Sequence, residues 1–161
     1  MSHLHLIRLA VAKDFDQLCQ LYEELDEHHR RARPDLFRAP SGARRERPFV
    51  EAFIAGPDST ILVAQTEAGR LLGLSAVIIR LVPSSAVRAE RRFAEIENLV
   101  VRADARRRGV AHALVQASAA WSSARGMTTL ELKVHEFNQG ARSFYETEGF
   151  TTTVRQMART I

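Results

Sequence analysis

The chain has 161 residues, a net charge of +4, a pI near 10.0, 45% hydrophobic residues and 26% charged residues. This balance indicates one globular domain over 1–161 and argues against extensive disorder. Cys19 is the only cysteine, which excludes an intrachain disulfide, and its apolar helical surroundings indicate a buried structural thiol rather than a nucleophile. No apolar stretch reaches the roughly 18–20 residues that span a bilayer, so we expect a cytoplasmic location and no membrane contact.

Hydrophobic periodicity predicts the elements of the first part of the chain. The segment Glu67-Ala68-Gly69-Arg70 lies between two runs rich in β-formers, and its turn-forming residues predict a hairpin. In chain order we expect a strand at 5–11, a helix from Lys13 that ends before Pro34, a loop at 30–48, a helix at about 45–55, strands at 60–66 and 71–82, a loop at 83–91 and a strand at 92–101.

The remaining part of the chain alternates helices and strands. Val110, Leu114, Ala117 and Trp121 recur on one face of a helix, which Gly126 is expected to end. A strand at 128–137, a helix at 139–148 and a final strand at 150–159 follow. The order predicts a mixed, mostly antiparallel sheet with helices on both faces.

Three arginines precede Gly109 where a helix is expected to begin, in the segment RRRGVAHALV (106–115). A strand, a glycine turn and a helix direct free backbone N–H groups at whatever lies above the helix start, and the helix dipole adds positive potential. Taken alone, these residues fit a solvated charge run at least as well. The segment lacks the P-loop pattern and the Gly-x-Gly-x-x-Gly of dinucleotide folds. In its strand–turn–helix context it predicts an anion site that suits a pyrophosphate.

Two motifs together resemble the GCN5-related N-acetyltransferase (GNAT) superfamily. The family pattern Gln/Arg-x-x-Gly-x-Gly/Ala is matched at 106–111 by Arg-Arg-Arg-Gly-Val-Ala. A second pattern is matched in register by Leu132-Lys133-Val134, Asn138, Ala141, Phe144-Tyr145 and Gly149-Phe150, so the resemblance covers about 93–150. It implies an α+β fold with a mostly antiparallel, twisted sheet of six to seven strands, helices on both faces, and a splay between the fourth and fifth strands.

The resemblance implies acetyl-CoA as co-substrate. The pantetheine arm would bond the backbone of the fourth strand, and the turn before the third helix would hold the pyrophosphate. Asn138 would contact the pantetheine arm, and it also suits a helix cap because it precedes Gln139-Gly140. The cofactor-binding residues implied are Leu99, Val100, Val101, Arg106, Arg107, Arg108, Gly109, Val110, Ala111, Asn138, Ala141 and Tyr145.

The resemblance also implies direct attack by an amine in a ternary complex, without an acyl-enzyme. Tyr145 would protonate the departing thiolate, since a phenol keeps its proton at pH 7, and a role as a core aromatic is the alternative. Glu95 and Glu97 lie two apart on one strand and so share a face. One of them, with Glu97 slightly favoured, would accept the amine proton through water, or both would orient the substrate cation. A backbone N–H near Leu99 would polarise the thioester carbonyl.

The loops at 28–40 and 83–92 flank the acceptor site in the family, which makes His28, Phe37 and Arg92 candidate substrate-side residues. His28 and His29 diverge by about 100° on a helix, so they chelate poorly as a pair, and no metal site is expected. The acceptor is left open as an amine-bearing small molecule, peptide or protein. A homodimer is compatible with the sequence but is not fixed by it.

Two other classes of function compete with an acetyltransferase. A GNAT-fold module that binds acyl-CoA without turnover would share the cofactor motif, but Tyr145 and the two glutamates argue against it. An arginine-rich nucleic-acid-binding domain would carry basic residues along one exposed face with interleaved aromatics. Instead, the arginines in the clusters at 30–33, 44–47 and 88–92 alternate with Asp, Glu and Pro. The sequence therefore favours acetyl transfer to a primary amine, with no nucleic-acid partner.

Overall fold

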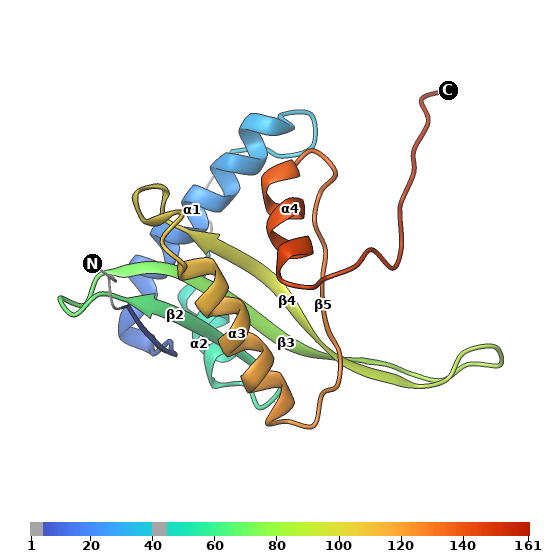
Figure 1. The fold of residues 1–161 in the computed structure, drawn as a ribbon, viewed down its shortest axis with the longest axis horizontal. Helices are drawn as coiled ribbons and strands as arrows, with labels where there is room; N and C mark the ends of the chain where they lie inside the picture. The colour runs from blue at the N-terminus through green and yellow to red at the C-terminus, as the bar shows by residue number, and fades with distance from the viewer. Residues whose placement is uncertain (1–4, 40–44) are drawn as a thin grey trace.

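The computed structural model describes residues 5–39 and 45–161, which build a five-stranded sheet in the order β1-β2-β3-β4-β5 (Figure 1). All neighbouring strands are antiparallel except β4 and β5, which are parallel. The elements are β1 (Leu6–Leu9), α1 (Phe15–Ala32), α2 (Arg47–Ala55), β2 (Ser59–Gln65), β3 (Leu71–Val82), β4 (Arg91–Val101), α3 (Val110–Ser123), β5 (Leu130–Leu132) and α4 (Gln139–Thr147).

Helices α1 and α2 cover one face of the sheet. Leu18 and Leu21 of α1 are fully buried against Leu74 of β3, and Val50 of α2 joins the same cluster. Complete burial of side chains of this size stabilises the fold by about 1.5–3 kcal/mol each, which explains the apolar helical stripe in the sequence. The buried Asp14 precedes α1, where it accepts hydrogen bonds from the Val11 N–H at 2.9 Å and from Arg8 at 2.7 Å.

Helix α3 packs on the opposite face, together with apolar side chains of α4. Leu114 is fully buried there, and Phe144 of α4 packs against the same cluster. The buried hydroxyls of Ser75 on β3 and Ser118 on α3 lie 2.8 Å apart and satisfy each other. Gly126, with φ +78°, follows the end of α3, in agreement with the sequence prediction.

The sequence prediction is confirmed for the hairpin between β2 and β3. There the Thr66 N–H donates to the Arg70 carbonyl at 2.9 Å, and Gly69 has φ +85°. The prediction is wrong at the carboxyl end. Segment 150–159 forms no strand and is exposed after Phe150, so the described residues form a sheet of five strands instead of six or seven, and β5 covers only three residues of the range 128–137. A strand needs a partner for its backbone hydrogen bonds, and the chain after Phe150 runs away from the sheet (Figure 1).

In the described residues, none of the helices combines the length and hydropathy that crossing a lipid bilayer requires.

Candidate active site

Strands β4 and β5 are paired over three positions and then separate. The ladder runs from the Ala94–Leu130 pair to the Ile96–Leu132 pair, whereas β4 continues to Val101. The edge of β4 beyond Ile96 is therefore outside the ladder, and its backbone groups face a gap rather than a neighbouring strand. This is the splay predicted between the fourth and fifth strands. Arg106 reaches back to this edge, where its Nε donates to the Val101 carbonyl at 3.2 Å.

The turn between β4 and α3 has an unusual backbone. Gly109 caps α3 with φ +77°, and Arg107 also has a positive φ of 62°. Left-handed residues in a turn help to direct neighbouring N–H groups into one concavity, which favours anions. The first N–H groups of α3 have no acceptor within the helix, and its dipole adds partial positive charge. The side chains of Arg106, Arg107 and Arg108 are exposed beside this turn, while Val110 is buried beneath it.

Helix α4 carries Asn138 and Tyr145. The Asn138 Oδ1 accepts a hydrogen bond from the Ala141 N–H at 3.2 Å, which confirms the helix-cap interpretation. The ring of Tyr145 lies 5.4 Å from that of Phe144 and 5.7 Å from that of Phe150, between centroids. Burial raises the pKa of Tyr145 to about 12, so its phenol keeps its proton at neutral pH.

Arg80 of β3 binds both candidate bases on β4. Its Nε donates to the Glu95 Oε2 at 3.0 Å, and its Nη2 donates to Glu97. The Lys133 Nζ donates to the other oxygen of Glu95 at 3.0 Å. Burial acts to raise the pKa of Glu95, but the hydrogen bonds from Lys133 and Arg80 outweigh it, and the pKa is lowered. Glu95 is thus buried and ionised with both oxygens bonded, whereas Glu97 is exposed on the same face.

Glu97 is an extra residue in the ladder between β3 and β4. Ala76 pairs with Asn98 and Val77 pairs with Ile96, so the residue between them has no partner on β3. Such a bulge redirects the side chains around it. Here Glu97 and Asn98, although consecutive, both line the cavities on the α1 and α2 side.

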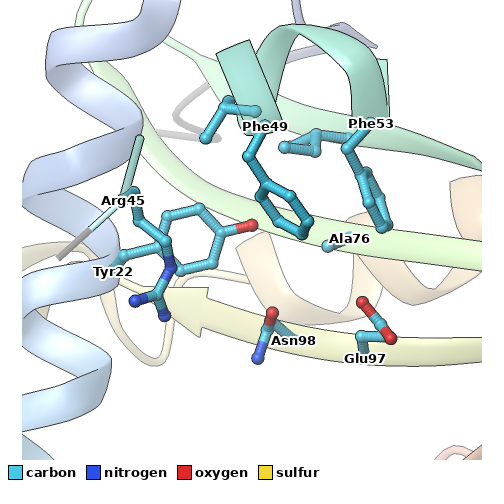
Figure 2. Close-up of a pocket in the computed structure, with 9 residues that line it drawn as sticks. Tyr22, Arg45, Phe49, Phe53, Ala76, Glu97 and Asn98 are labelled. Atoms are coloured by element: carbon cyan, nitrogen blue, oxygen red, sulfur yellow. The ribbon is translucent and has the colours of Figure 1, made fainter. Parts of the chain in front are cut away.

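One of these cavities is a pocket of about 50 Å³ beneath α1 and α2. Figure 2 shows Phe49 and Phe53 projecting side by side from α2 toward β3 and β4, with Tyr22 of α1 beside them. Glu97 and Asn98 lie on the opposite wall. The lining residues are Tyr22, Arg45, Phe49, Val50, Phe53, Ile61, Ala76, Glu97 and Asn98.

The other cavity is an open, polar groove of about 350 Å³ at the point where β4 and β5 separate. Its lining residues are Arg80, Glu95, Ile96, Glu97, Asn98 and Lys133. Glu97 and Asn98 line both cavities, so the groove and the apolar pocket meet at these two residues.

The candidate acceptor-side residues lie in two places. His28 and Phe37 belong to an aromatic cluster that joins the end of α1 to the loop after β5, in which His29 lies 5.5 Å from His135 between ring centroids. Arg92 lies elsewhere, at the start of β4, where its Nη2 donates to Asp58 at 3.1 Å. The structure therefore brings His28 and Phe37 together but leaves Arg92 apart from them.

Cys19 lies on α1 and is half-buried rather than buried. Burial is the main cause that raises the pKa of its thiol, so Cys19 is protonated at neutral pH and a poor nucleophile. This agrees with the prediction of a structural thiol.

Sequence reasoning missed Arg80 and the aromatic residues of the pocket. Arg80 is the only charged residue in the strand 71–82, and this charge was the available signal. The sequence indicates only core positions of two helices for Tyr22, Phe49 and Phe53. A pocket that forms between helices and a sheet leaves no pattern in the sequence of any one of these elements.

The fold is that of an N-acetyltransferase. Residues 18–150 match the Acetyltransferase (GNAT) family, and the chain belongs to this family. It is 26% identical over 144 residues to the uncharacterised N-acetyltransferase YhfO of Bacillus subtilis (strain 168), an alignment that covers 89% of this chain and 88% of YhfO.

Two solved structures show the same fold. The F44R mutant of BH1408 from Bacillus halodurans superposes with a TM-score of 0.91 at 24% identity, covering 97% of this chain and 99% of that one. The aminoglycoside 6′-N-acetyltransferase AAC(6′)-Ih from Acinetobacter baumannii superposes with a TM-score of 0.76 at 17% identity, covering 98% of both chains. At these identities the likeness concerns the fold alone.

Proposed function

We propose that the protein transfers the acetyl group of acetyl-CoA to a primary amine by direct attack in a ternary complex. The observation that carries this proposal is the meeting of the groove and the apolar pocket at Glu97 and Asn98. A thioester that enters along the β4–β5 gap and an amine that enters beneath α1 and α2 would meet there. The amine nitrogen bonds to the carbonyl carbon, the C–S bond breaks, and the sulfur leaves as the thiol of CoA.

The residues of this chain fit acetyl-CoA, which would supply the activated acetyl group. The turn with positive φ at Arg107 and Gly109 suits a pyrophosphate, and the three exposed arginines at 106–108 add positive potential. At the edge of β4, Leu99 and Val101 would offer backbone groups to the amides of a pantetheine arm, whereas the Val100 carbonyl lies toward Gly73 of β3. Asn138, Ala141 and Tyr145 of α4 would line the other side of the arm, and Val110 and Ala111 would contribute N–H groups to the phosphates.

We assign the base to Glu97 rather than to Glu95. Both oxygens of Glu95 are bonded to cations, and its lowered pKa opposes proton uptake. Glu97 is exposed at the meeting point of the two cavities, where its carboxylate attracts the ammonium and takes up its proton through water. Glu95 then acts as a positioning residue, because it holds Arg80 against Glu97.

Tyr145 would interact with the leaving sulfur. Its pKa of about 12 lies above the ordinary value of about 8.5 for a thiol, so complete proton transfer to a free thiolate would be uphill. A hydrogen bond donated from the Tyr145 hydroxyl while the C–S bond breaks stabilises the developing charge without that cost. A proton from water then neutralises the thiolate of CoA.

The cofactor part of the proposal is tested with two glycines of equal backbone strain. Gly109 and Gly126 have φ +77° and +78°, and a Cβ at either position would meet nothing within 4 Å. Gly109→Glu places a negative charge at the proposed pyrophosphate site, whereas Gly126→Glu places it beyond the far end of α3. Acetyl-CoA binding by calorimetry should be lost in Gly109→Glu and kept in Gly126→Glu. Equal affinity of both variants would contradict the proposed site.

The base assignment is tested by turnover, followed as release of the CoA thiol. Glu97→Gln should lower kcat by about 100-fold, the lower end of what a positioned acid or base contributes. Glu95→Gln should lower kcat less and shift its pH profile, because Arg80 and Lys133 lose a carboxylate that they share. If Glu95→Gln proves the more damaging to kcat at every pH, the two assignments are reversed.

A further inference from the structure

The pocket beneath α1 and α2 is apolar over most of its wall. The rings of Phe49 and Phe53 form one side, and the ring of Tyr22, which is buried, closes one end (Figure 2). Phe49 is 67% exposed although it is a large aromatic side chain. An exposed aromatic at the mouth of a pocket gains from any ligand that covers it, because burial of apolar surface is favourable.

Charge within the pocket is balanced rather than acidic. Among the described residues that line it, Glu97 is the only carboxylate, and Arg80 already bonds to it. Arg45 brings a positive charge to the same wall, where its guanidinium lies 4.5 Å from the centre of the Tyr22 ring and donates to Asp26 at 3.3 Å. A ligand with several ammonium groups would have to lose water from each of them, and the described wall of the pocket offers only the carboxylate of Glu97 to compensate.

The size of the pocket limits what can enter. A volume of about 50 Å³ is about one third of the roughly 150 Å³ of an apolar cavity that holds one benzene molecule. A short aliphatic chain therefore suits the pocket, whereas an aromatic ring on a linker or a sugar does not fit without movement of Phe49 or Phe53.

We infer that the acetyl acceptor is a compact apolar monoamine: a primary amine on a short aliphatic chain, without a second cation. The ammonium group lies at Glu97 and Asn98, and the aliphatic chain lies between the rings of Phe49 and Phe53 and Ala76. This inference rests on the proposed function, because it names the substrate class of the same site. It also separates this chain from its structural neighbour that is an aminoglycoside acetyltransferase, since a shared fold does not fix the substrate.

A panel of four amines at one acetyl-CoA concentration tests the inference. We expect kcat/KM for 3-methylbutylamine to exceed that for spermidine and for sisomicin by at least tenfold, with 2-phenylethylamine below 3-methylbutylamine. A polycation that matches or exceeds 3-methylbutylamine overturns the substrate class but leaves the acetyltransferase proposal intact. Binding of acetyl-CoA without turnover of any of the four amines also overturns the substrate class. Loss of acetyl-CoA binding itself is the separate result that contradicts the proposed function.

Substitutions in the pocket wall provide the second test. Phe53→Ala widens the pocket and should raise the ratio of kcat/KM for 2-phenylethylamine over 3-methylbutylamine by at least tenfold, the scale of selectivity that a change in an apolar pocket produces. Phe49→Ala should raise KM for 3-methylbutylamine by about tenfold. This substitution should leave folding intact, because the side chain of Phe49 is exposed. Leu81→Ala is the matched control, since Leu81 is 60% exposed on β3 and outside the pocket. Unchanged kinetics in Phe49→Ala overturn the inference even if Phe53→Ala does not fold.

Discussion

The Lys133 Nζ lies 3.0 Å from the Glu95 Oε1, and this ion pair joins β5 to β4 at the position where the two strands separate. The ladder ends at Leu132, so Lys133 is the first residue of the chain beyond it. The side chain of Lys133 is 88% exposed and that of Glu95 only 9%, so the pair links the surface to the interior of the sheet. We infer that this contact helps to set where the gap between the strands opens.

The first prediction concerns stability in acid. The pKa of Glu95 is lowered from its ordinary value of 4.5 in the folded protein, so the unfolded chain binds a proton at a higher pH than the folded one. Glu95 therefore contributes stability above about pH 4.5, and this contribution is lost as the pH falls through its lowered pKa. Thermal unfolding between pH 3 and 7 should show a steeper decline of Tm in the wild type than in Glu95→Gln. Parallel curves would contradict the role given to Glu95.

The second prediction concerns Tyr145. Tyr145→Phe removes only the hydroxyl and keeps the ring contacts with Phe144 and Phe150, so Tm should hardly change. We expect kcat to fall by about 100-fold while the Kd for acetyl-CoA stays within about twofold. Stopped assays of thiol release and calorimetric binding measure the two quantities. A kcat close to that of the wild type would show that the phenol does not assist the leaving group.

The third prediction concerns Arg102, which anchors the end of β4. Its Nε donates to the Leu71 carbonyl at 2.7 Å and its Nη2 to Gln20 at 2.8 Å, and its side chain is only 13% exposed. Arg102→Ala should lower the free energy of unfolding by about 2–3 kcal/mol, because the carbonyl of the buried Leu71 loses a charged donor.

The control for this measurement is Arg70→Ala. Arg70 also forms an ion pair, with Asp104 at 2.7 Å, but both side chains are about half exposed, so solvent screens the pair and the free energy of unfolding should change little. Equal effects of the two substitutions in urea unfolding would mean that the contacts of Arg102 do not anchor β4.

The fourth prediction concerns His29 in the aromatic cluster at the end of α1. Burial first, and then the nearby His135 and His28, lower the pKa of His29 from 6.5. The unfolded state therefore binds more protons in this range, and the contribution of His29 to stability is complete above about pH 6.5 and decreases as the pH falls below it. NMR titration of the ring should give a pKa below 6.5, and His29→Phe should reduce the loss of Tm between pH 7 and 5. A ring pKa at or above 6.5 would refute the burial argument.

Most of the fold could be predicted from local sequence patterns. The apolar stripes of α1 and α3, the hairpin at Glu67–Arg70 and the cap at Asn138 all depend on residues that lie within a few positions of one another. The strand expected at 150–159 was wrong for the opposite reason. Its alternation suits a strand, but a strand requires a distant partner, and none of the described segments pairs with it.

The sequence by itself determined the helices, the hairpin, the glycine turn at Gly109 and the acidic pair on β4, because backbone preferences and side-chain periodicity act over short distances. Only the tertiary structure distinguished the two members of that pair, of which Glu95 is buried and Glu97 is exposed. The bulge at Glu97, the contacts of Arg80 and Lys133 with Glu95, and the pocket between α2 and β4 all arise from strand register and packing. These depend on which distant residues meet, and a single sequence does not encode that in any local pattern.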